Sequence, residues 1–479
     1  MAVKSDQLAD PTTDFPAWYQ DVVARADLAD RGPAKGTMVI KPYGYRLWEL
    51  IQGDLDARFK ATGHENAYFP LFIPMSYIDK EAEHVDGFAP ELAVVTTAGG
   101  KTLDEPLVVR PTSETVIGEM MSRWIDSYRD LPMLLNQWAN VVRWELRPRL
   151  FLRTTEFLWQ EGHTAHADEQ DAMEETLRML ETYRAFAWDM AAIPVLTGEK
   201  TARERFAGAV STYPIEGMMR DGKALQMGTS HYLGTNFAKA FEIDYTDESN
   251  VKQLCHTTSW GVSTRLIGAI IMAHGDERGL VLPPRLAPHQ VVIIPVTRGD
   301  SATDVLAAVD QLAADLKAQG VRVHVDNRND RPGAKYWHWE LRGVPVRIEI
   351  GPRDLESGTA LVSQRIGDGK EAVALDAIAA GMQQRLDDYH NLLLERAMAF
   401  RDERTAVVSD WDAFTTQVQG GWAWAWHCGD SDCEVEIKEA SQATARLIAP
   451  DADADAPGTC IRCAKPGGYP ARVLFGKSY

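Results

Sequence analysis

The sequence lacks the features of several large classes of protein. In its 479 residues no apolar run approaches the roughly 20 residues that a membrane-spanning helix needs. The N-terminal segment MAVKSDQLADPTTDF has no apolar core of a secretory signal. Five cysteines are too few for a disulfide scaffold in a chain of this length. We therefore expect a cytoplasmic protein that does not associate with membranes.

Positive charge and a phosphate-binding loop are also missing. The formal net charge is −19, which argues against a protein that coats nucleic acid by bulk charge but leaves room for a local basic cleft. No segment has the pattern G-x-x-x-x-G-K-[ST], so an ATP site here cannot be a P-loop. The length exceeds what one hydrophobic core supports, which predicts two or three domains.

Hydrophobic periodicity in the first part of the chain predicts a mixture of helices and strands. It predicts helices over 43–62, 113–129 and 171–190, a strand-like run over 66–74 and a strand region over 150–161. Prolines 283, 284 and 288 then indicate a linker.

The pattern changes after the linker. Strands predicted over 290–296, 321–325 and 344–351 alternate with helices predicted over 303–319 and 335–343. This alternation is typical of a small α/β domain. From about residue 376 a long helical pattern leads into a tail that contains four of the five cysteines.

The segment RWELRPRLFLRTTEFLWQEGH, residues 143–163, concentrates charge of both signs between apolar side chains. Residues two apart in a strand share a face, so Arg143 and Glu145 are expected to point the same way. Arg153 approaches them if the chain folds back. Arginine forks bind phosphate oxygens and a glutamate accepts a hydrogen bond from an amine, so the set suits a nucleoside triphosphate. The alternative is a pair of strands with surface ion pairs.

Three further segments carry polar groups with ordinary structural explanations. In RPTSETVIG, Thr112 or Ser113 is expected to cap a helix whose first turn contains Glu114. In QMGTSHYLGTNF, His231 taken alone is typical of a hydrogen-bonded structural histidine. In CHTTSWGVSTR, Arg265 taken alone is typical of a solvated turn residue.

Taken together, these segments resemble class II aminoacyl-tRNA synthetases, and more closely the prolyl-tRNA synthetases. GHENAYFPLFIP resembles the first family motif, which builds a dimer interface, VVRWELRPRLFLRTTEFLWQEGH the second, and TSWGVSTRLIG the third. RPTSE and WQEGH resemble elements of the proline pocket. The third motif departs from the general class II pattern, which is glycine-rich with an acidic residue before its arginine. Here only Gly261 and Thr264 stand near Arg265.

The resemblance extends over nearly the whole chain and implies a fold and a reaction. It implies an α+β catalytic domain with an antiparallel sheet over 1–285, an α/β anticodon-binding domain over 286–385, and a small C-terminal zinc-binding α/β domain over 386–479. The implied homodimeric enzyme activates L-proline with ATP and Mg²⁺ to prolyl-adenylate and transfers it to the 3′ end of tRNA(Pro). Only about a hundred residues separate the second and third motifs, so we expect no inserted editing domain.

The resemblance also implies site residues. Arg143 and Arg265 are the expected catalytic residues, with Arg143 at the α-phosphate, Arg265 at the far phosphates and Glu145 at the adenine amine. The expected ATP-binding set is Arg143, Glu145, Arg153, Thr154, Gln226, Thr229, Ser263 and Arg265. The expected proline-binding set is Thr112, Glu114, Arg143, Trp159, Glu161, His163, His231 and Ser259.

The tail contains two close cysteine pairs, Cys428-x4-Cys433 and Cys460-x2-Cys463. Four thiolates in two pairs suit a structural, tetrahedral Zn²⁺, and the alternative is free or disulfide-bonded thiols. Cys255 is expected to be a small buried hydrophobe. The resemblance brings the last residue, Tyr479, toward the catalytic domain, and the expected anticodon contacts are Glu340, Glu349, Arg353 and Asp354.

Two alternative functions make different demands on the sequence. A class II synthetase for threonine would hold an active-site zinc, but Cys255 and His256 are adjacent and lack an evident third ligand. A synthetase-like regulator that binds uncharged tRNA without catalysis would be expected to lose Arg143 or Arg265, and both are present.

Overall fold

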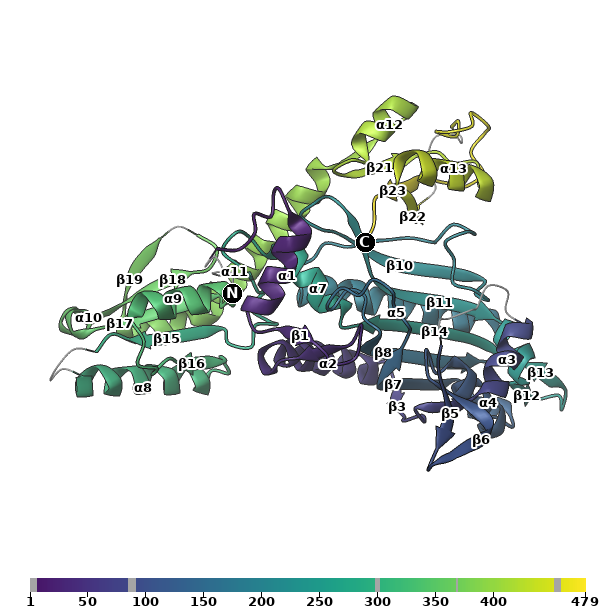
Figure 1. Cartoon of the computed structure of the whole chain (residues 1–479), viewed down its shortest axis with the longest axis horizontal. Coiled ribbons are helices and arrows are strands. Elements are labelled where there is room, and N and C mark those ends of the chain that lie inside the picture. The colour runs from purple at the N-terminus through teal and green to yellow at the C-terminus, as the bar shows by residue number, and fades with distance from the viewer. Residues whose placement is uncertain (1–6, 85–91, 298–301, 368, 452–457) are drawn as a thin grey trace.

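The computed structural model describes residues 7–84, 92–297, 302–367, 369–451 and 458–479. Its elements fall into three groups, one around a large sheet, one around a smaller sheet at the far end of the molecule, and one near the C-terminus (Figure 1). No helix in these ranges combines the length and apolar character needed to cross a membrane.

Seven strands form the large sheet. In spatial order they are β3 (Glu65–Asn66), β7 (Met133–Val142), β8 (Glu156–His166), β14 (His256–Ser263), β11 (Ala224–Gly234), β10 (Ser211–Met218) and β9 (Leu196–Thr197). The sheet is mixed rather than purely antiparallel as predicted, because β3 and β7 pair in parallel while the other neighbours are antiparallel. This order places β14 between β8 and β11, so segments about a hundred residues apart become neighbours.

Helices and small sheets surround the large sheet. The helices are α1 (Phe15–Arg25), α2 (Pro42–Ala61), α3 (Met75–His84), α4 (Glu114–Trp124), the 3₁₀ turn η1 (Tyr128–Asp130), α5 (Glu169–Asp189), α6 (Asn236–Phe241) and α7 (Arg265–His274). The small sheets pair β1 (Ala29–Arg31) with β2 (Met38–Ile40), β12 (Asp244–Thr246) with β13 (Lys252–Leu254), and β6 (Lys101–Val109) with both β4 (Phe72–Pro74) and β5 (Ala93–Ala98). Between β8 and β14, where no inserted domain was expected, the chain forms α5, β9 to β11, α6, β12 and β13.

The second group of elements is a five-stranded sheet flanked by helices. Its strands, in spatial order, are β16 (Val323–Val325), β15 (Val291–Pro295), β17 (Val346–Ile350), β18 (Thr359–Gln364) and β19 (Lys370–Ala374), and its helices are α8 (Ala302–Ala318), α9 (Pro332–Leu341) and α10 (Pro352–Ser357). β15 pairs in parallel with both neighbours and every one of its residues is buried. Strands buried on both faces are continuously apolar, so the run VVIIP was identifiable from sequence.

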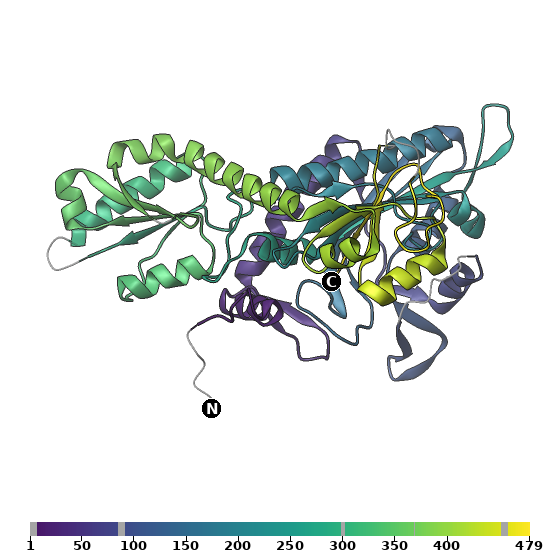
Figure 2. The same ribbon diagram turned by 90° about the horizontal axis from the view of Figure 1, so that it is seen from above.

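The third group follows the long helix α11 (Leu375–Glu403), which leads from the second group toward the large sheet (Figures 1 and 2). It contains a sheet in the order β20 (Thr405–Val407), β21 (Trp422–Ala425), β23 (Val473–Gly476) and β22 (Thr444–Ile448), with helices α12 (Trp411–Gln417) and α13 (Ser431–Ser441). Its edge contacts the large-sheet group, because the Ile448 amide donates to the Glu199 carbonyl at 2.7 Å. We call this group the C-terminal domain.

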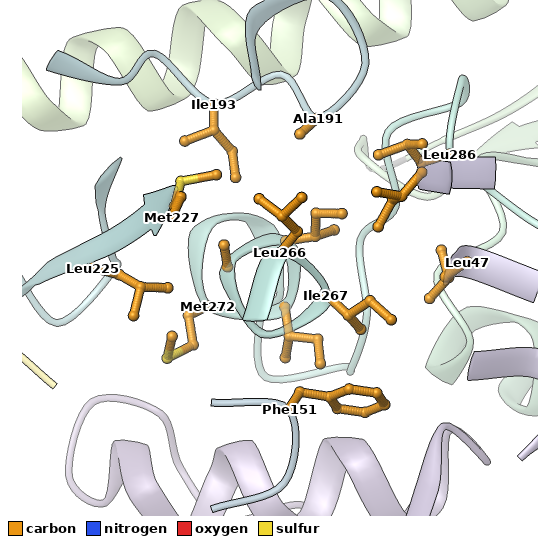
Figure 3. Close-up of a cluster of buried hydrophobic side chains, with 14 of the residues drawn as sticks. Leu47, Phe151, Ala191, Ile193, Leu225, Met227, Leu266, Ile267, Met272 and Leu286 are labelled. Atoms are coloured by element: carbon orange, nitrogen blue, oxygen red, sulfur yellow. The ribbon is translucent and has the colours of Figure 1, made fainter. Parts of the chain in front are cut away.

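The core beside the large sheet is built around α7 (Figure 3). Leu266, Ile267 and Met272 project from α7 toward Leu225 and Met227 of β11 and toward apolar side chains from α2 and the loops. Fully burying a side chain of this size contributes roughly 1.5–3 kcal/mol. This packing fixes the position of α7 and therefore of Arg265, its first residue.

The expected strand over 150–161 is wrong in its first half. Leu150 to Leu152 form a turn, Arg153 forms an isolated bridge with Arg149, and β8 begins only at Glu156. Phe151 has φ +62°, outside the strand region, and Phe151 and Leu152 are both buried in the core although they are adjacent in sequence. The apolar residues whose sequence pattern predicted a strand therefore pack into the core from a turn.

Candidate active site

A cavity of about 320 Å³ opens over one face of the large sheet. A second cavity of about 270 Å³ lies at the turn between β7 and β8. Arg143, Phe157, Ser263 and Arg265 line both cavities, which therefore form one continuous site. Every residue predicted to contact ATP or proline lines one or both of them.

Strand alternation explains how β8 and β14 build the floor. On β8, Trp159, Glu161 and His163 are two residues apart and so share a face. On β14, Ser259 pairs with His163, and Ser263 with Trp159. Directly opposite residues of antiparallel strands point to the same side, so two distant sequence segments supply one continuous surface.

Arg143 lies one residue beyond the end of β7. Its Nε donates to the carbonyl of Pro111 at 3.0 Å, and its guanidinium lies 5.2 Å from the centre of the Trp159 ring. Burial lowers the pKa of Arg143, and the nearby carboxylates of Glu114 and Glu161 oppose that shift. The cation is thus fixed against an aromatic wall.

The strand expected to carry Arg143 and Glu145 ends at Val142, but both side chains line the same cavity at the turn between β7 and β8. The expected return of the chain is confirmed. Arg153 Nε lies 3.4 Å from a carboxylate oxygen of Glu145, and the amide of Arg143 donates to the carbonyl of Thr155 at 2.8 Å.

Arg265 approaches the same site from α7. Its Nε donates to the Leu152 carbonyl at 3.2 Å and its Nη1 to the Gln226 carbonyl at 3.3 Å. Burial lowers its pKa to about 10, helped by the positive charges of Arg153 and Arg143. Three guanidinium groups drawn together in this way form a strong site for an anion with several oxygens. The predicted convergence of Arg143 and Arg265 is confirmed.

Glu161 is the centre of a hydrogen-bond network at the other end of the cavity. One carboxylate oxygen accepts from the Ser113 amide at 3.0 Å and from Thr112 Oγ1 at 3.3 Å, and lies 3.2 Å from His163 Nε2. The other accepts from Gln137 Nε2 at 3.0 Å. Burial raises the pKa of Glu161, but the His163 ring and the hydrogen bonding of Ser113 lower it by a larger amount, so the net shift is downward.

This network replaces the helix cap that the sequence predicted. Ser113 occupies the N-cap position of α4, but no side-chain hydrogen bond caps this helix. Its hydroxyl instead accepts from Gln137 Nε2 at 2.9 Å, while Thr112 donates to Glu161. Glu114 lies in the first turn, as predicted. The predicted N-cap position is therefore confirmed at Ser113, but its side chain makes no capping hydrogen bond because a tertiary partner competes for the hydroxyl group.

His231 closes the side of the cavity formed by β10 and β11. Its Nδ1 lies 2.9 Å from Thr212 Oγ1, and its ring lies 4.6 Å from the ring of Phe206. Burial, with a smaller contribution from His163, lowers the pKa of His231 to about 3. The imidazole is therefore neutral near pH 7 and serves as a hydrogen-bonding wall.

Among the residues that line the cavity, the indole nitrogen of Trp159 and the hydroxyl of Ser259 are buried and have no hydrogen-bond partner among the described residues. Buried polar groups are nearly always hydrogen-bonded. Both atoms are therefore available to a ligand or to water in the cavity.

The cavity includes side chains that were not predicted. Phe157, Glu204, Phe206 and Thr212 also line it. Phe157 could have been found, because it precedes Trp159 by two residues in β8. Glu204 and Phe206 lie in an irregular segment with no periodic pattern, so only the tertiary fold reveals them.

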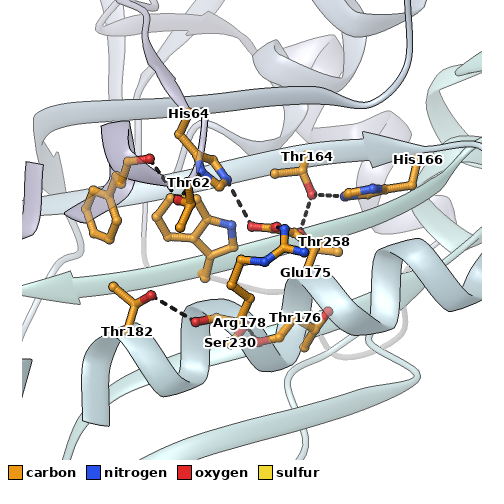
Figure 4. A network of polar contacts seen from close by, with 12 residues as sticks. Thr62, His64, Thr164, His166, Glu175, Thr176, Arg178, Thr182, Ser230 and Thr258 are labelled. Atoms are coloured by element: carbon orange, nitrogen blue, oxygen red, sulfur yellow. Dashed lines mark hydrogen bonds and ion pairs between the residues drawn. The ribbon is translucent and has the colours of Figure 1, made fainter. Parts of the chain in front are cut away.

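A buried polar network supports the sheet on the face opposite the cavity (Figure 4). His64 Nε2 lies 2.9 Å from one carboxylate oxygen of Glu175 on α5, and Arg178 donates to the other at 2.5 Å. The His64 ring meets the ring of Trp260 edge-on at 5.0 Å. A Cβ on Gly162 would lie 2.1 Å from that same indole. Trp260 therefore requires glycine on the neighbouring strand.

The four tail cysteines lie together in the C-terminal domain. The sulfurs of Cys433 and Cys460 are 3.8 Å apart, and those of Cys428 and Cys463 are 3.5 Å apart. A ring nitrogen of His427 also lies within 4.8 Å of the sulfurs of Cys428, Cys433 and Cys460. Thiolate and imidazole are the ligands that Zn²⁺ prefers, so the residues present fit that metal. His427 directly precedes Cys428 in the sequence, but the pattern of two cysteine pairs does not single it out.

A further cavity of about 350 Å³ lies in the second group of elements. Glu340 lines it together with four cations, Arg278, Arg347, Arg365 and Lys370. The other predicted anticodon residues lie elsewhere. Glu349 is buried and accepts from Tyr336 and Lys370, Arg353 is exposed, and Asp354 accepts from the Gly351 amide at 2.7 Å.

Three protein-family models match the chain. They are the tRNA synthetase class II core domain (G, H, P, S and T) over residues 97–274, the anticodon binding domain over residues 290–385, and the prolyl-tRNA synthetase C-terminal domain over residues 411–479.

Curated and solved proteins resemble the chain over almost its full length. Proline–tRNA ligase 2 of Rhodococcus jostii is 62% identical over 468 residues, with 97% of each chain covered. Proline–tRNA ligase of Deinococcus radiodurans is 54% identical, with 98% of this chain and 95% of the relative covered. The crystal structure of a prolyl-tRNA synthetase from Cryptosporidium parvum, complexed with halofuginone and AMPPNP, is 38% identical with a TM-score of 0.93, covering 98% of this chain and 99% of that one.

Proposed function

The chain belongs to the proline–tRNA ligase family, and from this premise we propose which of its residues carry out each part of the reaction. It is an aminoacyl-tRNA synthetase that joins proline to tRNA with ATP. We propose that ATP occupies the end of the site formed by Arg143, Arg153 and Arg265, and that proline occupies the end around Glu161. The guanidinium groups of Arg143, Arg153 and Arg265 converge from the end of β7, the following turn and α7. This convergence is the observation that carries the proposal.

The ATP end takes its chemistry from the three arginines. We assign the α-phosphate to Arg143 and the far phosphates to Arg265. Both residues line both cavities. Glu145 accepts the adenine amine beside Arg153 and Thr154. Bound Mg²⁺ would neutralise phosphate charge, and the residues proposed to face ATP and that ion are Gln226, Thr229 and Ser263.

The proline end offers an apolar wall and a carboxylate. Trp159 faces the ring of the substrate, and Thr112, His163, His231 and Ser259 complete the walls. Glu161 already accepts hydrogen bonds from surrounding groups at both carboxylate oxygens. We assign the secondary ammonium of proline to a carboxylate at this end, Glu114 or Glu161, both of which line the cavity.

The arrangement supports adenylate formation without a general base. The attacking carboxylate of proline is already ionised near pH 7, so no proton needs to be removed. What the chain supplies is alignment of that oxygen with the α-phosphorus and stabilisation of developing negative charge by Arg143 and Arg265. The prolyl group then passes to the 3′ end of tRNA(Pro).

The remaining parts of the chain suit the other needs of such an enzyme. We propose that the cavity lined by Glu340 and the four cations receives an anticodon nucleotide, because arginine and lysine bind phosphate and base edges. We also propose that Cys428, Cys433, Cys460 and Cys463 hold a structural Zn²⁺, with His427 beside it. Four protein ligands leave no open position for catalysis at such a metal.

We propose a cytoplasmic homodimer. Tyr68 and Phe72, in the segment that resembles the first family motif, are 77% and 48% exposed. Large apolar side chains grouped on a surface mark interaction sites. Sedimentation velocity of the purified chain tests the dimer, and a single monomeric species would exclude it.

Amino-acid-dependent ATP–pyrophosphate exchange tests the site assignment. Across the twenty amino acids, proline alone is expected to support strong exchange. Arg143→Ala is expected to abolish it, while Arg123→Ala removes an exposed arginine paired with Glu119 and should leave it unchanged. Full exchange by Arg143→Ala would refute the assignment.

A further inference from the structure

Three charged side chains from two domains meet in a fully buried cluster beside the ATP end of the site. Glu216 of β10 is buried, and its carboxylate accepts from Lys200 Nζ at 3.0 Å. Arg446, on β22 of the C-terminal domain, donates from its Nη2 atom to both carboxylate oxygens of Glu216, at 2.7 and 2.9 Å. Such a cluster is retained at a desolvation cost of several kcal/mol per ion, which calls for an explanation beyond docking.

The strand register connects this cluster to the site. Glu216 pairs directly with Gln226 of β11. Gln226 lines the cavity, and its carbonyl accepts the hydrogen bond from Arg265 Nη1 at 3.3 Å. Thr212, four residues before Glu216 on β10, also lines the cavity, and a register shift falls between Ile215 and Glu216. The cluster therefore lies at the margin of the surface on which ATP is proposed to sit.

The charges of the cluster also reach Arg265. Burial lowers the pKa of Arg265 most strongly. Glu216 raises this pKa, and Arg446 lowers it. Groups interact in this way only when they are close in a poorly screened environment. The C-terminal domain therefore places the guanidinium of Arg446 in the surroundings of the phosphate site.

We propose that Arg446 is a positioning residue for ATP, supplied by the C-terminal domain. By holding Glu216, it fixes the β10–β11 edge that presents Gln226 and orients Arg265 toward the far phosphates. Docking of the C-terminal domain is then required for a complete ATP site as well as for stability. This role is separate from the zinc cluster, and it rests on the assignment of the Arg265 end to ATP.

Kinetics with each substrate varied in turn distinguish positioning from docking. In ATP–pyrophosphate exchange, Arg446→Gln is expected to raise KM for ATP by about 10- to 100-fold, the range produced by small misplacement of a binding group. KM for proline should change by less than about twofold, because the proline end has separate contacts. Arg446→Lys restores the charge and should recover most of the affinity for ATP.

The control is Arg401→Ala, which removes another arginine that joins later elements to the large-sheet group. Arg401 Nη1 donates to the Pro194 carbonyl at 3.2 Å and lines no part of the site. It should leave both KM values unchanged. Equal increases in both KM values for Arg446→Gln, or no increase for ATP, would overturn the proposal.

Two more variants keep the test decisive. If Arg446→Gln does not fold, Glu216→Asp retains all three charges but shortens the carboxylate. It should still raise KM for ATP severalfold, and an unchanged value would contradict the proposal. Arg265→Ala checks the premise. If Arg265→Ala leaves KM for ATP unchanged, the assignment of ATP to this end of the site is wrong. If Arg265→Ala loses ATP binding while the Arg446 variants keep an unchanged KM for ATP, only the role of Arg446 is refuted.

Discussion

Replacing Glu161 by glutamine keeps the shape of the side chain but converts one acceptor oxygen into an amide that donates. Both carboxylate oxygens of Glu161 face donors, namely Ser113 and Thr112 on one side and Gln137 on the other. Whichever way the new amide turns, its NH₂ group meets a donor. At least one buried hydrogen bond to a charged group is lost, and the partner is left unsatisfied.

The expected cost follows from these contacts. A hydrogen bond to a charged group contributes about 1.5–3 kcal/mol, and an unsatisfied buried partner costs about 1–3 kcal/mol more. We expect Glu161→Gln to lower the free energy of unfolding at about pH 7 by about 3–5 kcal/mol, the range found for breaking buried charged pairs. Because Thr112 and His163 line the cavity, KM for proline should rise as well.

The effect depends on pH in a definite direction. The pKa of Glu161 in the folded protein lies below its ordinary value. Its ionised form therefore stabilises the folded state above the unfolded pKa of about 4.3, and this contribution is lost as the pH falls through the lower, folded value. Glutamine does not titrate. The difference in stability between the two proteins should thus be full at about pH 7 and shrink below about pH 4.

Urea titrations at several pH values measure this difference, with Glu119→Gln as the matched control. Glu119 is partly exposed and lies 2.6 Å from Arg123 on α4, a surface pair whose loss should cost less than about 1 kcal/mol. If Glu161→Gln is no more destabilising than the control, or if its effect does not shrink in acid, the description of Glu161 as a fully satisfied buried carboxylate is wrong.

Three other substitutions address the support of the site and the tail. Gly162→Ala places a Cβ 2.1 Å from the Trp260 indole, so it should lower the free energy of unfolding by at least about 1–3 kcal/mol, measured by urea titration. Glu175→Gln removes the charge that pairs with His64 at 2.9 Å and should cost about 3–5 kcal/mol in the same titration. Cys433→Ser should reduce bound zinc, measured by atomic emission, and lower the melting temperature, because structural zinc contributes directly to folding.

Gly162→Ala and Cys433→Ser each have a matched control. Gly53→Ala lies in α2 with no atom within 4 Å of the added methyl group, so it should be neutral or stabilising. An equally harmless Gly162→Ala would contradict the close packing of Trp260. Cys255→Ser alters a buried cysteine outside the tail and should retain full zinc content. Normal zinc content in Cys433→Ser would exclude that thiolate as a ligand.

The sequence was most informative where pattern and packing act in the same direction. The continuously apolar run over 291–295 predicted β15, and helical spacing predicted α2 and α5 to within two residues. It failed where local and tertiary preferences compete. Leu150 to Leu152 pack inward from a turn and do not form the expected strand. The Ser113 side chain makes no capping hydrogen bond to α4, because its hydroxyl accepts one from Gln137.

The same contrast applies to the site. Arg143, Glu161 and Arg265 could be identified because the motifs that contain them are distinctive, and the structure brings them to one continuous cavity. Arg446 could not be identified, because its role depends on the docking of one domain against another. No periodic pattern in β22 distinguishes a surface arginine from one that meets a buried carboxylate.

Helix α7 links two distant parts of the molecule mechanically. Arg265 begins it, and two residues beyond its last residue, His274, the carboxylate of Asp276 accepts hydrogen bonds from Arg365 of the second group. Nearly every side chain of the helix is buried, so it cannot bend or slide by itself without opening voids. A pull on its far end therefore arrives at Arg265 as motion of a single stiff rod about 15 Å long. Strain applied where Arg365 meets Asp276 is then transmitted to the cavity that Arg265 lines.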